Sequence, residues 1–130
     1  MQKLNGTPKP GNFLKWFDPR NRQSGSWAFI LNRITAIGLT VYLYLHLVIL
    51  SLLAQGPDAY DSFVKLAKTP IVLTGEFLVV AAGIIHGLNG LRIILNSFGI
   101  AVPQQKPLFY GLMAVAVVAS LWFAYVMFTA

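Results

Sequence analysis

The sequence contains no cysteine and little charge. Without a thiol, the chain of 130 residues can form no disulfide, and it offers no thiolate nucleophile, no cysteine-ligated iron–sulfur cluster and no covalent c-type haem attachment. Charged residues make up only 11% of the chain, and only four of them are acidic. Without cysteine, histidine is the only strong metal donor in the chain, and there are two histidines.

Apolar residues, by contrast, are abundant. They make up 56% of the chain and give a mean hydropathy of +0.64, which is more apolar surface than a soluble domain of this size can bury. A bilayer core needs roughly 20 apolar residues for each helix, so the length allows three spans. Because three helices bury little surface against one another, we expect the chain to be a subunit of a larger assembly. We predict an all-α membrane protein with three transmembrane helices, packed within a larger helical bundle.

Proline, glycine and polar clusters mark the ends of the apolar stretches. Gln55-Gly56-Pro57-Asp58 ends the first stretch, Pro70 suits the first turn of the second, and Asn96-Ser97-Phe98-Gly99 ends the second. The predicted helices cover about residues 27–54, 70–95 and 107–129. They make residues 27–130 a three-helix transmembrane anchor behind a basic arm over residues 1–26, and they leave residues 55–69 as a connecting loop.

The charge distribution predicts the orientation of the chain. The arm over residues 1–26 carries five lysines and arginines against Asp18 alone, and it lacks the apolar core of a signal peptide. By the positive-inside rule the N-terminus is cytoplasmic, and three spans then place the C-terminus outside, in a multi-pass protein of the cell inner (cytoplasmic) membrane. The net charge of +6 reflects this topology and contacts with membrane lipid or an acidic partner, and it argues against binding of nucleic acid.

His46 and His86 lie inside the first and second apolar stretches. Ionisable side chains at such depth usually mark a site, and imidazole is a common axial ligand of b-type haem. Counted from the predicted helix ends, the two differ in depth by ~12 Å. Trans axial nitrogens on one iron lie only about 4 Å apart, so the two histidines do not share one haem. Three readings remain: each ligates a separate haem with a partner subunit, only one is a ligand, or both merely bond neighbouring helices.

Small and basic residues surround His86 on the predicted second helix. Gly83 and Gly90 flank it at i−3 and i+4, where a flat macrocycle could approach the backbone. Arg92 follows toward the basic side, where its guanidinium could pair with haem propionates or could simply extend to lipid phosphate at the interface. The alternative is that the glycines only form a helix-packing face of the small-xxx-small type.

Arg33 stands several residues inside the first apolar stretch, where a charge needs an anionic partner or a polar cavity. Ser26 lies seven residues earlier and so on the same face, and the pair could donate hydrogen bonds to a quinone carbonyl, with Trp27 as a flat wall. The alternative is a serine cap and an interfacial tryptophan anchor. Glu76 is the one carboxylate within a span, at ~9 Å depth, and is a candidate for proton transfer or a propionate contact. The alternative is a protonated or hydrogen-bonded glutamate near the interface.

Two segments carry a family resemblance. Residues 26–36, SWAFILNRITA, resemble the first-helix signature of the succinate dehydrogenase cytochrome b subunit, although Asn32 stands where a histidine is usual and Phe29 where many members have a quinone-site serine. His86-Gly87-Leu88-Asn89-Gly90-Leu91-Arg92 resembles the second-helix haem motif of that family. The chain is thus similar to the cytochrome b556 subunits (membrane anchor C), in particular to their di-haem branch.

The resemblance implies a non-catalytic subunit of a succinate dehydrogenase or fumarate reductase complex, respiratory complex II, which links the tricarboxylic acid cycle to electron transport. His86 would ligate haem b, His46 a second haem, and Arg33 would bind quinone, with menaquinone suited to a two-haem path. A second membrane-anchor subunit, an iron–sulfur subunit and a flavoprotein subunit would be the partners. The alternatives are a haem-binding anchor of another membrane oxidoreductase and a haem-free structural subunit.

Overall fold

The structure, a computed structural model, describes residues 24–129. Its elements are α1 (Ser24–Ser51), the 3-10 helix η2 (Leu52–Gln55), α2 (Pro57–Ala67), α3 (Pro70–Ser97) and α4 (Gln105–Thr129). The predicted all-α architecture is confirmed: α1 continued by η2, α3 and α4 are each long and apolar enough to cross a membrane. The predicted basic arm lies almost entirely outside the described residues.

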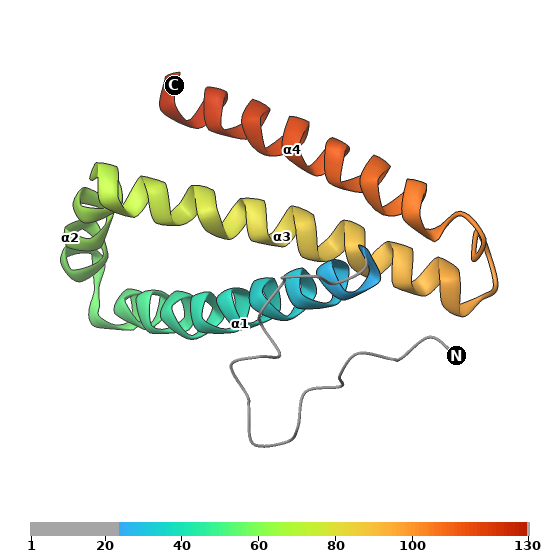
Figure 1. The fold of residues 1–130 in the computed structure, drawn as a ribbon. Helices are drawn as coiled ribbons and strands as arrows, with labels where there is room; N and C mark the ends of the chain where they lie inside the picture. Colours follow the sequence, from blue (N-terminus) through green and yellow to red (C-terminus); the bar gives the residue numbers. More distant parts are fainter. Residues whose placement is uncertain (1–23, 130) are drawn as a thin grey trace, which may run out of the picture.

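Helix α3 lies between α1 and α4 and runs antiparallel to both (Figure 1). It packs along each of them, whereas α1 and α4 barely touch one another. The two sides of α3 are therefore where polar side chains can be shielded from lipid by protein. Functional groups on this chain are best sought along α3 and on the faces of its two neighbours that turn toward it.

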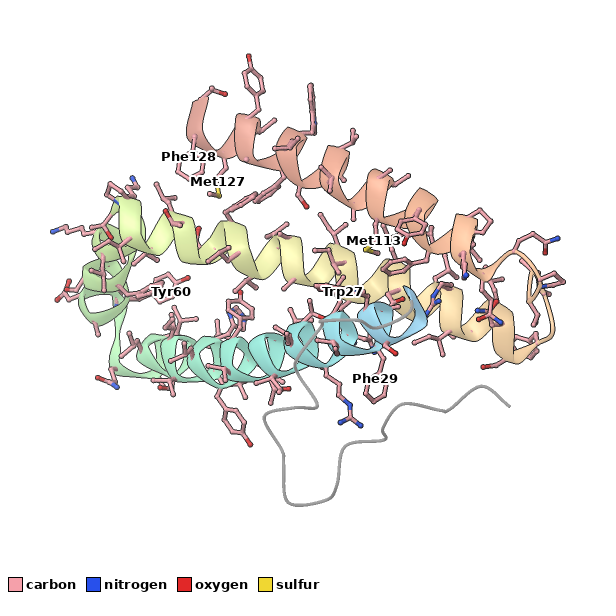
Figure 2. The ribbon with its side chains drawn as sticks, viewed as in Figure 1. Trp27, Phe29, Tyr60, Met113, Met127 and Phe128 are labelled. Atoms are coloured by element: carbon pink, nitrogen blue, oxygen red, sulfur yellow. The ribbon has the colours of Figure 1, made fainter. Side chains whose placement is uncertain are left out.

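The buried core is small and unusually polar. Ala28, Ile30, Phe109 and Ala116 are its apolar members. Thr35, Asn89, Arg92 and Ser120 are buried with them. Most of the large apolar side chains stay exposed, as expected of helices that face lipid or the helices of another subunit. Figure 2 shows Met113 and Met127 turned from α4 toward α3, which extends the apolar contact on that side.

The segment predicted as a connecting loop, residues 55–69, contains the helix α2. Gly56 adopts φ 108°, a conformation that favours glycine, and Pro57 then starts α2 in the first-turn position that suits proline. The Gly-Pro pair ends one helix but also begins the next. Tyr60 extends from α2 toward the space between α1 and α3 (Figure 2), while the neighbouring Asp61 is exposed.

Helix α3 ends at Ser97, two residues beyond the predicted end near residue 95 and inside the polar cluster of residues 96–99. Gly99 has φ 76°, its N–H donates to the Asn96 carbonyl at 3.0 Å, and the Ile100 N–H donates to the Leu95 carbonyl at 2.9 Å. These two bonds form a Schellman motif, which satisfies carbonyls that a helix end leaves free. The short turn that follows brings α4 back along α3 (Figure 1).

Candidate functional site

The His86 side chain on α3 faces α1. Its Nδ1 lies 3.2 Å from the Asn32 carbonyl oxygen and 3.1 Å from Thr35 Oγ1. A carbonyl only accepts hydrogen bonds, so Nδ1 carries the hydrogen and donates it. The single hydroxyl hydrogen of Thr35 is directed to the Leu31 carbonyl at 2.8 Å, which leaves an oxygen lone pair to accept from Nδ1. Nδ1 is therefore the ring nitrogen that donates to α1, and Nε2 makes no hydrogen bond among the described residues.

This arrangement is chemically suited to binding a metal through Nε2. Histidine ligands commonly donate their other ring N–H to a backbone carbonyl, which fixes the tautomer and the ring orientation. Within residues 24–129, no three histidine, aspartate or glutamate side chains come together to hold an ion. A metal at His86 would thus bring most of its ligands with it, as iron does in a porphyrin. The donor set fits haem better than a bare ion.

Asn89, one turn beyond His86, links α3 to α1 directly and to α4 through Arg92. Its side chain is fully buried. Nδ2 donates to the Ala28 carbonyl of α1 at 3.0 Å, and Oδ1 accepts from Arg92 Nε at 3.1 Å. The Arg92 guanidinium in turn lies over the Phe109 ring of α4, 5.4 Å from its centroid. Asn89 thereby fixes the position of Arg92, the residue that the sequence assigns to haem propionates.

The glycines near His86 divide into two groups. A Cβ at Gly83 would lie 3.9 Å from Leu39 Cδ2, so this glycine belongs to the packing contact between α3 and α1. A Cβ at Gly87 or Gly90 would meet no neighbouring atom within 4 Å. The two positions leave open space beside the α3 backbone, as a flat macrocycle would require, whereas Gly83 fits the helix-packing interpretation.

His46 lies on the same helix as Thr35, eleven residues further on, which corresponds to about 17 Å along the axis. Because Thr35 touches His86, the two histidines are separated by about that distance, more than the ~12 Å counted from the sequence. The structure does not bring them together. Tyr42 OH is 3.4 Å from His46 Nδ1, and the two rings are 5.5 Å apart.

The candidate quinone residues stand at the start of α1. Arg33 is exposed, and its guanidinium stacks on the Phe29 ring, 4.2 Å from the centroid. Figure 2 shows Phe29 pointing away from α3, so this pair faces outward from the bundle. Ser26 is half-buried and Trp27 is exposed.

Glu76, the candidate for proton transfer, is an exposed residue of α3 near the α2 end. It lies on the half of the helix opposite to Arg92, so the structure separates it from the polar groups around His86 and Asn89.

Sequence reasoning missed three residues of this site: Thr35, Asn89 and the carbonyl of Asn32. The signal that could have found them is their polarity inside apolar stretches, because a polar side chain in lipid needs a partner. In the sequence, Asn32 stands out only because it replaces the usual histidine of the first-helix signature. In the structure its backbone oxygen accepts from His86, while its side-chain Oδ1 is buried without a hydrogen bond among the described residues.

Comparison with known proteins places this arrangement in a family context. Residues 18–125 match the family described as Succinate dehydrogenase/Fumarate reductase transmembrane subunit. The chain is 33% identical over 84 residues to the succinate dehydrogenase 2 membrane subunit SdhC of Mycobacterium tuberculosis, over 65% of this chain and 62% of that protein. It is 34% identical over 101 residues to the succinate dehydrogenase hydrophobic membrane anchor subunit of Halobacterium salinarum, over 75% of this chain and 78% of that protein. The chain thus spans somewhat less than two thirds of the length of its mycobacterial relative.

Proposed function

The chain belongs to the succinate dehydrogenase/fumarate reductase transmembrane subunit family, and we propose that it is the cytochrome b anchor of a succinate:quinone oxidoreductase. In this function it ligates b-type haem, helps to form the quinone site and passes electrons from iron–sulfur clusters to quinone. Its partners are a second membrane anchor, an iron–sulfur subunit and a flavoprotein subunit. The observation that carries the proposal is the imidazole of His86, whose Nδ1 bonds α1 while Nε2 makes no hydrogen bond among the described residues.

The residues around His86 would hold a haem in three ways. Nε2 would ligate the iron, the open space at Gly90 would admit the edge of the macrocycle, and Asn32 and Thr35 would keep the imidazole from rotating. When bound, haem would supply a one-electron carrier at this position. A partner subunit would provide the opposite ligand, because the only other histidine, His46, is about 17 Å away along the bundle.

His46 we assign to a second haem at greater distance from the basic end, as in the di-haem branch of the family. Its separation from His86 supports two haems at two depths rather than one. Tyr42 is placed to bond its Nδ1, which leaves Nε2 as the ligand atom in the same sense as for His86.

Arg33, with Ser26 and Trp27, we assign to quinone. The support is that the guanidinium is exposed on the outward face of α1, held by the Phe29 ring and available to an acceptor from outside the chain.

The orientation also remains a proposal, with the N-terminus in the cytoplasm and the C-terminus outside. At the α2 end Lys65 and Lys68 stand beside Asp58 and Asp61, whereas among the described residues Arg92 and Lys106 at the opposite end have no acidic residue beside them, which agrees with a cytoplasmic face there.

Difference spectra of the purified complex, reduced minus oxidised, test the haem assignment. We expect His86→Ala to abolish one b-type haem and His46→Ala to abolish another. Thr35→Val should weaken haem retention about tenfold, the scale typical of a lost partner to a metal-bound histidine. Thr40→Val is the matched control, because the Thr40 hydroxyl bonds only the Ala36 carbonyl of its own helix. Full haem content in both histidine variants would refute the proposal.

A haem-free structural subunit is the second candidate function. The observation that favours it is the same His86 contact, because the imidazole already joins α3 to α1 through Nδ1. In that case His86→Ala lowers the stability of the complex and changes no absorbance band. His86→Asn would then restore part of the lost stability, since an amide can also donate to a carbonyl.

A further inference from the structure

A cavity of about 500 Å³ lies at the end of the bundle away from α2. The start of α1, the end of α3 and the start of α4 meet there. It is lined by Gly25, Arg92, Val102, Pro103, Gln105, Lys106, Pro107 and Phe109. Two of these residues are cations and none is acidic, so the cavity is positively charged. Its remaining wall is largely apolar.

Arg92 is the unusual member of this lining. It is only 9% exposed, and within residues 24–129 its guanidinium makes one hydrogen bond, from Nε to Asn89. The Phe109 ring compensates the charge in part. The terminal nitrogens of the guanidinium offer donors that match the oxygens of phosphate in pairs. A charge buried to this extent needs an anion close by.

The described part of the chain supplies no such anion. Its acidic residues are Asp58 and Asp61 on α2 and Glu76 on α3, all toward the other end of the bundle. Glu76 precedes Arg92 by sixteen residues, about 24 Å along α3. The counter-charge must therefore come from another molecule or from outside the described residues.

The depth of the cavity in the bilayer points to a phospholipid as the molecule that supplies the counter-charge. With 28 residues, α3 is about 42 Å long, the thickness of a bilayer including its headgroups. Arg92 lies five residues, about 7.5 Å, from the end of the helix, at the boundary between hydrocarbon and headgroups. Lys106 is the second residue of α4 at the same boundary. Phospholipid phosphates lie at this level, and Pro107 and Phe109 present apolar surface to the start of an acyl chain.

We propose that this cavity binds the phosphate of an anionic phospholipid, with Arg92 as the buried ligand and Lys106 as the outer one. Asn89 orients the guanidinium toward the cavity. The site would clamp the turn between α3 and α4 against the start of α1, and so stabilise the three-helix arrangement on that face of the membrane. It depends on lipid rather than on haem, and its test is independent of the function proposed above.

The test uses the purified complex after removal of lipid. Phosphatidylglycerol should raise its unfolding temperature, whereas uncharged diacylglycerol and inorganic phosphate should not. Lys106→Gln should require about five times more phosphatidylglycerol for the same effect, the factor expected for one lost cation near a membrane surface. Lys68→Gln, an exposed lysine at the α2 end, is the matched control and should behave as the unaltered complex does. Because Arg92 also bonds Asn89, Arg92→Gln can prevent assembly, and the Lys106 variant therefore carries the test.

Four results would overturn the proposal. Equal phospholipid requirements of the unaltered and Lys106→Gln complexes would show that the cavity does not hold lipid. Equal stabilisation by inorganic phosphate would identify a free anion. Loss of haem from Lys106→Gln with an unchanged lipid response would identify a propionate as the occupant. An Asp18→Asn variant with a larger lipid response than the unaltered complex would identify the N-terminal arm as the counter-charge. An intact haem spectrum beside a weakened lipid response supports the proposal.

Discussion

Replacing Asn89 with alanine should destabilise the bundle more than any other single polar deletion on α3. The side chain is fully buried and makes two hydrogen bonds of different kinds. One joins α3 to the Ala28 carbonyl of α1, and the other satisfies the charged Arg92 Nε–H. Asn89→Ala removes both bonds, so the Ala28 carbonyl loses the Asn89 donor and the buried Arg92 Nε–H loses its acceptor.

The expected loss follows from the two bonds. A hydrogen bond between membrane helices contributes about 0.6–2 kcal/mol, and one to a charged group about 1.5–3 kcal/mol. Their sum, reduced for relaxation of the long Arg92 side chain toward other acceptors, gives a destabilisation of about 2–4 kcal/mol. Asn89→Asp should lose less, because it keeps an acceptor for Arg92 and loses only the donor to Ala28.

Asn96 is the matched control, since it lies on the same helix two turns further on and its Oδ1 is buried without a partner among the described residues. Asn96→Ala removes no hydrogen bond of that oxygen and should be neutral or stabilising.

The assay is the fraction of the chain that stays with the purified complex after heating. Asn89→Ala should lower the midpoint by about 5 °C or more, and Asn96→Ala should not. Equal shifts for the two variants would refute the reasoning, because they would mean that the loss reflects side-chain volume and not the two bonds.

Three further predictions address other parts of the chain. Gly99→Ala places a Cβ on a residue with φ 76° and should destabilise the folded chain by about 1–2 kcal/mol. The same heating assay should then show a lower midpoint temperature. Phe29→Leu removes the ring under the Arg33 guanidinium and should raise KM for quinone several-fold with little change in kcat, whereas Phe29→Tyr should restore KM, and an unchanged KM in the leucine variant would argue against a quinone contact. Because the chain lacks cysteine, the variants Lys65→Cys and Lys106→Cys each carry one cysteine that an impermeant reagent can label in sealed vesicles. The proposed topology requires Lys65→Cys to react from outside and Lys106→Cys only from the cytoplasmic side. The reverse labelling pattern would invert the proposed topology.

The helices could be predicted from the sequence because lipid imposes a simple condition on length and polarity. Uninterrupted apolar stretches and the turn residues between them located α1, α3 and α4 to within a few residues. Helix α2 is not predicted because the Gly56-Pro57 pair, taken by itself, indicates only the end of the first helix. Its amphipathic pattern is short, with Tyr60 and Phe63 on one side, and a connecting loop of similar composition would look the same.

The candidate site was predictable only in part. The type of residue identified His86, since an imidazole inside a membrane is rare, but its partners lie 51 and 54 residues away on α1. Their pairing depends on how far α1 is shifted along α3. Sequence does not reveal that register, because lipid-facing and helix-facing positions are equally apolar. The same uncertainty made the sequence-based separation of His86 from His46 too small.

The polar residues of α3 explain how this register is fixed without a large apolar core. His86, Asn89 and Arg92 follow one another in steps of three, and each step on a helix of 3.6 residues per turn falls back by about 60°. The series therefore winds across α3, from the side that faces α1 to the side that faces Phe109 on α4. His86 and Asn89 bond the carbonyls of Asn32 and Ala28, which lie one turn apart on α1. A slip of α1 by one turn would take the Thr35 hydroxyl away from His86 Nδ1, so a group that positions the proposed haem ligand also specifies the helix register. The double variant with Thr35→Val and Asn89→Ala should accordingly lose more haem than the two single variants together, because it removes the Thr35 contact and the Ala28 bond and leaves only the His86–Asn32 bond of this series.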